Sequence, residues 1–381
     1  MKIAFIGPAY PLRGGIAEFL MKTVEKAVHS GHQVKIYSFQ KQYPKLIFPG
    51  KDQYDHSKKN YPYEIFRSFI PYNPLTWKKG IREIIEFQPD LVIFKYWIPF
   101  FSPMYARIIN ELRKHTQAKM MYIIHNIRFH EKWMFAKNLT QMALRRSDYL
   151  VSLSKSVYES IFEILPGFPH QNVIQAFHPN YEVTPLNEEQ KHNAYFDLKI
   201  SPRKTILFFG YIKHYKGLDI LIKAFQKVNE NHKDIQLLIA GEVYGNDEQY
   251  HKLIRDNGLE DYVVFHNYFI KNEDIPKYFA IADVVVQPYR SATQSGVSLL
   301  ALSYSKPVIS TQTGALDEII IPNKNGILVP PENINALAQA IIDFFEKYDR
   351  ESMIRFIQHE IDQYSWNSFI NKILNPFHEV R

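Results

Sequence analysis

The sequence predicts an α/β protein made of two doubly wound parallel-sheet domains that face each other across a cleft. Three observations lead to this prediction. The chain has 381 residues, more than one hydrophobic core usually supports. Short apolar runs alternate with stretches that carry apolar residues at helical spacing. A polar stretch over residues 181–204 interrupts this alternation once, near the middle of the chain.

The apolar runs are typical of buried parallel strands, and strand–helix alternation favours a doubly wound sheet. The strands expected in the first half are Ile3–Ile6, Val34–Tyr37, Leu91–Phe94, Met121–Ile124, Tyr149–Val151 and Val173–Ile174. Those expected in the second half are Ile206–Phe209, Leu237–Ala240, Val263–Phe265, Val284–Val286 and Val308–Ile309. The expected helices include Glu18–Val28, Pro103–Arg113, Leu218–Val228 and Ile334–Phe345.

The polar stretch is the expected linker, so we predict one domain over residues 1–190 and a second over residues 200–360. Residues 41–63 carry several lysines, tyrosines and prolines without a clear period, which predicts a long loop. In open parallel sheets, ligands bind beyond the carboxyl ends of the strands. The loops at those ends are therefore the candidate functional segments.

Composition excludes several classes of site. The chain is 46% hydrophobic and 22% charged, which is typical of a globular protein. It has no cysteine, which excludes disulfide frameworks, thiolate zinc sites and thiol nucleophiles. Its apolar runs are far shorter than the roughly 20 residues that span a bilayer, and no secretion signal is visible at the N-terminus. We therefore expect a cytoplasmic protein.

The two halves of the chain differ in charge. Residues 1–180 hold 25 Lys and Arg against 13 Asp and Glu, about +12, whereas residues 181–381 hold 21 against 26, about −5. A basic half indicates an anionic partner, such as a phosphate-bearing substrate, a membrane surface or nucleic acid. A merely solvated basic surface is an equal alternative.

The first strand leads into a loop that ends in Gly14 and Gly15, just before the first helix. Paired glycines at a helix start let backbone N–H groups approach an anion closely. The spacing is not that of a dinucleotide-binding motif, and a plain tight turn is an equally good reading of this segment alone.

The second half opens in the same manner. The strand Ile206–Phe209 is followed by a loop that contains Lys213, and Lys216 stands directly before Gly217 and a helix. A lysine at this position can place its charge on a phosphate at the helix end. The alternative is a solvated lysine beside a turn glycine.

A third loop follows the strand Val284–Val286 and precedes a helix that begins near Val297. Its small hydroxyl residues and glycine suit a phosphate or sugar, and an arginine adds a fork-shaped cation. The residues concerned are Arg290, Thr293, Gln294, Ser295 and Gly296. Helix capping by Ser295 or Thr293 is a compatible explanation.

His125 follows the strand Met121–Ile124 directly and so stands at the ligand-binding edge. His130 and Glu131 are close by in sequence, but no metal-ligand motif joins them. We therefore predict no metal site. A P-loop, a serine-hydrolase elbow and a kinase signature are also missing from the sequence.

Taken together and in order, these loops resemble the retaining nucleotide-sugar glycosyltransferases of the two-Rossmann (GT-B) type, glycosyltransferase family four. The likeness spans nearly the whole chain. Its most specific part is the run from Phe208 to Phe225, FFGYIKHYKGLDILIKAF, which looks like the segment that opens the family's donor domain. Further matches are Ile239–Gly241, Ala282–Val284, Lys306–Ile309, and Gly314 with Glu318 before Asn325–Val329.

The resemblance implies roles for particular residues. Gly14 and Gly15 would border the donor diphosphate, Lys216 would neutralise it, and His125 would lie near the transferred sugar. Residues 293–296 would contact the sugar hydroxyls and the β-phosphate, and main-chain groups around residues 264–267 would meet the base. The C-terminal segment, residues 361–381, would cross back to the first domain as a helix.

Three positions depart from the family pattern. Tyr211 stands where the family usually has an arginine, so Lys213 or Arg290 would have to replace that cation. Ala292 and Leu300 stand where the family has paired glutamates, the second of which holds the ribose hydroxyls. Gln294 and Ser298 offer polar groups nearby, which would replace the lost ribose contact.

The resemblance implies a nucleotide-sugar substrate, no separate cofactor, and a leaving phosphate that takes the acceptor's proton. The sequence has no Asp-x-Asp pair to hold a metal, so fixed cations are expected to stabilise the charge of the leaving phosphate. The basic first half and segment 41–63 suggest a glycan or lipid-linked acceptor bound peripherally at an anionic membrane. Nucleic acid is not expected, because no recognised binding module is present. One alternative is a non-catalytic sugar- or nucleotide-binding protein of this fold. Another is a nicotinamide-dependent oxidoreductase, which lacks the third glycine and the acidic residue after the second strand.

Overall fold

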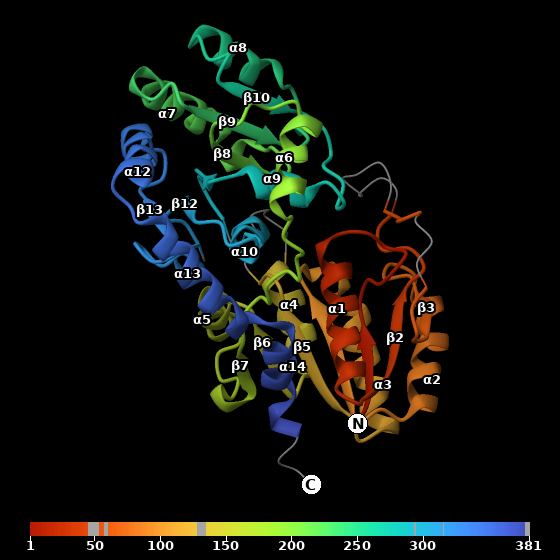
Figure 1. Cartoon of the computed structure of the whole chain (residues 1–381). Helices are drawn as coiled ribbons and strands as arrows, with labels where there is room; N and C mark the ends of the chain where they lie inside the picture. Colours follow the sequence, from red (N-terminus) through yellow and green to blue (C-terminus); the bar gives the residue numbers. More distant parts are fainter. Residues whose placement is uncertain (45–52, 57–59, 128–134, 293–294, 315, 378–381) are drawn as a thin grey trace. The chain divides into compact units, whose positions relative to one another are not determined.

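The computed structural model describes residues 1–44, 53–56, 60–127, 135–292, 295–314 and 316–377. The chain forms two compact units, one of Met1–His178 with Trp366–Arg381 and one of Pro179–Ser365. Each unit is a parallel sheet with helices on both faces (Figure 1). This confirms the prediction of two Rossmann-like α/β domains.

The sheet of unit 1 has seven strands in the order β3-β2-β1-β4-β5-β6-β7, and all neighbours are parallel. The order reverses beside β1, which pairs with both β2 and β4. The strands are β1 (Lys2–Ile6), β2 (Gln33–Phe39), β3 (Ile65–Phe69), β4 (Leu91–Tyr96), β5 (Lys119–Ile124), β6 (Tyr149–Ser152) and β7 (Val173–Gln175).

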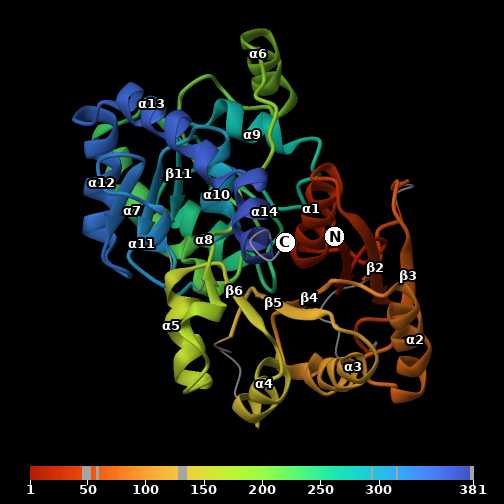
Figure 2. The same ribbon diagram turned by 90° about the horizontal axis from the view of Figure 1, so that it is seen from below.

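Two apolar layers cover this sheet because its side chains alternate between faces. In β4, Leu91 and Ile93 pack with α1 and α14, whereas Val92 and Phe94 pack with α2 and α3. Figure 2 shows α1 and α14 on one side of the sheet and α3 and α4 on the other. The α-helices are α1 (Gly15–His29), α2 (Trp77–Phe87), α3 (Ser102–His115), α4 (Ala136–Leu144), α5 (Lys155–Ile164) and α14 (Trp366–Leu374). The 3-10 helices are η1 (Pro74–Thr76), η2 (Pro99–Phe101), η3 (His170–Asn172) and η6 (Asn375–Phe377).

The sheet of unit 2 has six parallel strands in the order β10-β9-β8-β11-β12-β13, reversing beside β8. The strands are β8 (Lys204–Phe209), β9 (Ile235–Ala240), β10 (Val263–His266), β11 (Val284–Gln287), β12 (Val308–Thr311) and β13 (Gly326–Val329). The helices are α6 (Glu188–Asp197), η4 (His214–Lys216), α7 (Leu218–Asn231), α8 (Glu248–Asp256), α9 (Ile275–Ile281), α10 (Gly296–Ser303), α11 (Leu316–Ile319), α12 (Ile334–Glu346), α13 (Arg350–Glu360) and η5 (Ile361–Tyr364).

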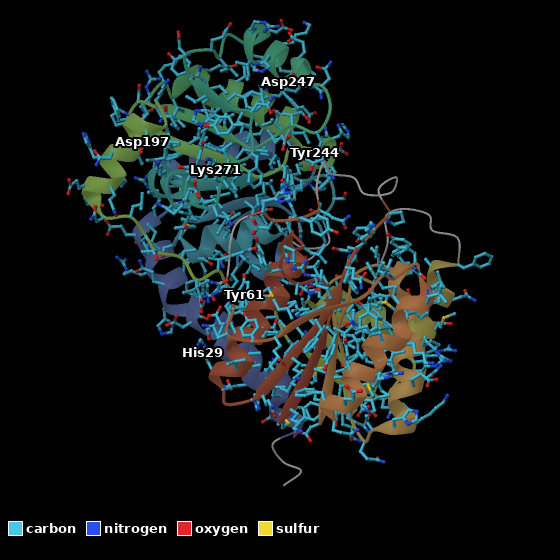
Figure 3. All side chains as sticks on the ribbon, turned by 90° about the vertical axis from the view of Figure 1, so that its right-hand side faces the viewer. His29, Tyr61, Asp197, Tyr244, Asp247 and Lys271 are labelled. Atoms are coloured by element: carbon cyan, nitrogen blue, oxygen red, sulfur yellow. The ribbon has the colours of Figure 1, made fainter. Side chains whose placement is uncertain are left out.

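The division between the units falls at residues 178–179, earlier than the expected boundary at 190. The polar stretch is not a bare linker, because Asn187 and Gln190 form a capping box that starts α6. Asp197 at the end of α6, labelled in Figure 3, pairs with Lys277 of α9 at 2.9 Å, which ties this helix to the rest of unit 2.

The C-terminal segment joins unit 1 from Trp366 onward, rather than from residue 361, because η5 ends at Tyr364 within unit 2. Trp366 and Phe369 of α14 pack edge-on against Phe19 of α1, with ring centroids 5.0 and 5.5 Å away. Within the described residues, the structure has no helix both long and apolar enough to cross a bilayer.

Candidate active site

The loop after β8 in unit 2 carries the candidate phosphate ligand. The chain leaves β8 through Gly210 and turns into α7 through Gly217, which has φ of 68°. A Cβ on Gly217 would lie 2.1 Å from the carbonyl oxygen of Pro288, so only glycine lets this loop pack against the loop after β11. The two loops flank the point at which the strand order reverses.

Lys216 ends η4, immediately before this glycine, and its side chain is half-buried. Its amine lies 5.3 Å from the ring centroid of Tyr289, a buried residue of the loop after β11. Burial lowers the pKa of Lys216 below its ordinary value. Among the described residues, no carboxylate pairs with this amine. An ammonium held by an aromatic face without a counter-ion is suited to receive an anionic ligand.

Arg290 fixes the loop that carries Lys216. Its guanidinium donates two hydrogen bonds to the carboxylate of Asp219, at 2.7 and 2.9 Å, and one of 2.7 Å to the carbonyl oxygen of His214. It also reaches Glu332 at 3.2 Å. Although burial alone would raise the pKa of Asp219, the hydrogen bonds from Arg290 lower it. In this structure Arg290 therefore holds η4 and α7 against the loop after β11. The expected contact of Arg290 with a nucleotide sugar stays a prediction.

The start of α10 rests on a buried polar network. Gln287 donates to the hydroxyl of Ser295 at 2.9 Å and accepts a hydrogen bond from the hydroxyl of Ser298. The Ser295 hydroxyl in turn accepts from the backbone N–H of Ser298 and so caps the helix. The hydroxyls of Ser295 and Ser298 are thus used inside unit 2, and this network sets the direction of the helix N-terminus.

Gly296 begins α10, and a Cβ there would lie 2.9 Å from the hydroxyl of Tyr181. Two other expected donor ligands, Thr293 and Gln294, lie outside the described residues. Leu300 is half-buried and packs against an apolar cluster beside the sheet. The family's ribose contact has no carboxylate at this position.

Tyr211 stands in an exposed aromatic group in place of the family's arginine. Its ring lies 5.2 Å from that of Tyr244 and 6.0 Å from that of Phe269. The amine of Lys213 lies 4.9 Å from the Tyr244 ring centroid. Asn267 accepts a hydrogen bond from the backbone N–H of Val243 and donates one to the carboxylate of Asp247, which fixes the segment around Tyr244. Figure 3 labels Tyr244 and Asp247. Lys213 is therefore an exposed cation on this loop cluster.

In unit 1, Gly14 and Gly15 form the start of α1. Gly14 has φ of 114°, and its carbonyl oxygen accepts from Ala17 and Glu18 at 3.0 and 3.1 Å. A Cβ on either glycine would meet no atom within 4 Å, so the turn is open. Among the described residues no side chain caps this helix, which leaves its N-terminal N–H groups for a ligand.

His125 stands at the carboxyl end of β5, and its backbone N–H bonds the carbonyl oxygen of Tyr96 at 2.8 Å. Its ring lies edge-on to Phe19, with centroids 4.6 Å apart. Burial, together with the nearby Lys95 and His178, holds the pKa of His125 well below its ordinary value. Its Nε2 is buried and has no hydrogen-bond partner among the described residues. The imidazole is therefore neutral, with one nitrogen left for a ligand.

Sequence reasoning missed Lys95, a lysine inside β4 that lies beside His125. The sequence predicts a plain buried strand over Leu91–Phe94, which ends before the lysine, and nothing in the pattern marks Lys95 as special. The possible metal pair His130 and Glu131 lies outside the described residues. Across the described part of the chain, no three acidic or histidine side chains gather closely enough to hold a metal ion.

Comparisons with known proteins agree with this geometry. Residues 13–173 match the family model described as Glycosyltransferase Family 4, and residues 203–347 match the model described as Glycosyl transferases group 1. The chain is 25% identical to an uncharacterized glycosyltransferase of Methanocaldococcus jannaschii, over 99% of this chain and 98% of that protein. It is 23% identical to a GDP-mannose-dependent alpha-(1-6)-phosphatidylinositol monomannoside mannosyltransferase of Mycobacterium tuberculosis, over 95% and 94%.

A solved structure, that of the Anabaena protein HepE in complex with UDP, resembles the whole chain. Its TM-score is 0.76 at 17% identity, and all of both chains is covered. At that identity the likeness establishes the fold: a pair of Rossmann-like domains of the GT-B type.

Proposed function

The chain belongs to the glycosyltransferases of family four and group 1, and we propose that it moves a hexose from a nucleotide diphosphate to a hydroxyl of a glycan or lipid-linked acceptor. We infer retention at the sugar carbon and a reaction without a metal, in surface polysaccharide or glycoconjugate synthesis. The observation that carries the proposal is Lys216, whose half-buried side chain has no acidic partner in the described residues and stands at a helix start.

The residues fit the charges of such a reaction. When the bond between the sugar carbon and the diphosphate oxygen breaks, its electron pair stays on the leaving phosphate. Lys216 and the N-terminus of α10 would stabilise that charge by fixed electrostatics. The acceptor oxygen bonds to the sugar carbon, and its proton passes to the leaving phosphate, so no carboxylate base is needed. His125 would offer Nε2 to a hydroxyl of the transferred sugar.

The names of two similar proteins suggest the first nucleotides to test. One relative is named as GDP-mannose-dependent, and the HepE structure contains UDP. We therefore propose a thermal-shift screen with UDP, GDP and ADP, followed by a panel of sugar donors carried by the nucleotide that binds. An enzyme of this type hydrolyses its donor slowly without an acceptor, so free nucleoside diphosphate should accumulate.

A non-catalytic sugar- or nucleotide-binding protein is the second candidate, favoured by the half-buried Leu300 and by Ala292 in the loop, where the family has glutamates. The donor panel separates the two functions. Binding of a nucleotide sugar without any release of nucleoside diphosphate, in the presence and absence of glycan acceptors, would favour the binding protein. Release that disappears in Lys216→Met would favour the transferase.

The acceptor side is proposed from charge. Residues 1–180, nearly all of them in unit 1, have a formal charge of about +12, which suits a phosphate-bearing acceptor at the inner face of an anionic membrane. Vesicles that contain phosphatidylglycerol should bind the protein, and binding should weaken as salt rises, because exposed charges are screened. Equal binding to neutral vesicles, or no binding at all, would move the proposal to a cytoplasmic, unanchored glycan acceptor.

A further inference from the structure

Unit 1 contains a lysine in its core. Lys95 of β4 is fully buried, with 0% of its side chain exposed. Its amine contacts the hydroxyl of Thr23 in α1 at 3.2 Å and lies 4.0 Å from the ring centroid of Phe19. Among the described residues it has no ion pair. Burying an amine in this way is costly, so a role beyond packing has to be considered.

The fold makes room for this lysine. A Cβ on Gly7, directly after β1, would lie 3.1 Å from Lys95 Cγ and 2.8 Å from Leu20 Cδ1, so the glycine lets both side chains pack closely against the chain here. Thr23 donates its own hydroxyl proton to the carbonyl oxygen of Phe19, at 2.6 Å, which leaves its oxygen lone pair for the ammonium. Together, Gly7, Thr23 and Phe19 form a socket around Lys95, and burial in this socket lowers the pKa of the lysine well below its ordinary value.

Phe19 connects this socket to His125. Lys95 pairs with Ile123 in the sheet, and His125 continues the same strand two residues later, so both side chains project to the α1 face. The centroid of the Phe19 ring lies 4.0 Å from the Lys95 amine, 4.6 Å from the centroid of the His125 ring and 5.0 Å from that of the His178 ring. Three basic groups thus lie close to one aromatic ring.

Among the described residues, no acidic side chain contributes to the pKa shift of Lys95 or of His125. On α1, Glu18 is exposed, and Glu25 pairs with Lys22 at 2.9 Å. On α14 the charged residue is Lys372, whose amine lies 6.0 Å from the ring of Phe177. The charges that face His125 are therefore those of Lys95 and His178, and both oppose its protonation.

We propose that Lys95 is a positioning residue that keeps His125 an uncharged imidazole, so that its free Nε2 meets the sugar as a neutral hydrogen-bonding group. Burial lowers the pKa of both Lys95 and His125. Because Thr23 and the Phe19 ring support a charge on Lys95, we place the first proton taken up by this pair on the lysine. A second proton on His125 would face that charge inside a poorly solvated site. The part of the inference that names the sugar rests on the proposed function; the electrostatic part does not.

The test is a histidine titration, which needs no substrate. Protein labelled with 13C in the histidine ring is titrated by NMR between pH 8 and pH 5, and the His125 signal is identified by its loss in His125→Gln. We expect His125 not to titrate in this range in the unmodified protein. In Lys95→Met, which keeps the stem but removes the charge, its pKa should rise by about one unit or more, which is the effect of a nearby unit charge at intermediate dielectric.

Two further variants keep the test decisive. Thr23→Val is nearly isosteric and removes the hydroxyl that supports the Lys95 ammonium. It should therefore raise the pKa of His125 by a smaller amount than Lys95→Met does, and it replaces that variant if Lys95→Met does not fold. Lys306→Met is the matched control: this buried lysine of unit 2 has a pKa lowered to about 8 by burial and the nearby Lys191, and its removal should leave His125 unchanged. A His125 titration that neither Lys95→Met nor Thr23→Val moves would overturn the inference, whatever the activity of the protein.

Discussion

At the scale of single residues, the candidate site depends on cations that are buried without acidic partners. Replacing Lys216 by Met removes a desolvated ammonium and keeps an apolar stem of similar length. We therefore expect the unliganded variant to keep or gain thermal stability. Its affinity for a nucleoside diphosphate should fall by roughly 10- to 100-fold, because hydrogen bonds to charged groups contribute about 1.5–3 kcal/mol. Calorimetric titration and thermal unfolding measure the two effects, with Lys306→Met as the control for removing a buried lysine. Loss of stability without loss of affinity would contradict this assignment.

The same residue predicts a pH dependence. Burial lowers the pKa of Lys216, so it loses its proton at a lower pH than an exposed lysine does. The ammonium is the form that binds the diphosphate. Affinity should therefore be full below this lowered pKa and decrease as pH rises through it. Measurements above pH 7 avoid the ionisation of the terminal phosphate. The decrease should be absent in Lys216→Met; a decrease of equal size in that variant would assign the titration to another group.

At the scale of elements, the turn from η4 into α7 requires a glycine for two reasons. Gly217 has positive φ, and its Cβ position is 2.1 Å from the Pro288 carbonyl oxygen. Gly217→Ala must displace one loop from the other and should cost more than about 3 kcal/mol of unfolding free energy, with a weaker nucleotide site. Gly31→Ala is the control, because Gly31 also has positive φ but an added Cβ meets nothing within 4 Å. It should cost about 1 kcal/mol. Chemical denaturation of both variants makes the comparison, and equal costs would show that the loop contact is unimportant.

The elements also show what the sequence can and cannot predict. Central strands such as β4 and β9 were predictable because all their residues are buried and apolar runs mark them. The edge strands β3 and β13 were missed, since β3 carries Arg67 among its apolar residues and β13 begins with a glycine directly after the polar residues 323–325. Lys216 could be found because a lysine before a helix-starting glycine is a local pattern. The role of Arg290 as a clamp could not, because Asp219 is distant from it in sequence and both loops had to be placed first.

At the scale of the whole molecule, the chain leaves unit 1 and returns to it at its end. Phe369 of α14 is fully buried and packs against Phe19 of α1, so the last helix completes the core of the first unit. Phe369→Ala should remove about 3 kcal/mol or more from unit 1 and lower its unfolding transition by roughly 6–12 °C. The transition of unit 2 should not move. Phe344→Ala in α12 is the matched variant, since Phe344 is equally buried in unit 2 and the change should lower only the unfolding transition of unit 2.

A nucleoside diphosphate that binds at Lys216 should raise the transition that Phe344→Ala lowers. Calorimetric scans of the two variants, with and without nucleotide, therefore assign each transition to a unit, and a single transition lowered equally by both would show that the units do not unfold independently.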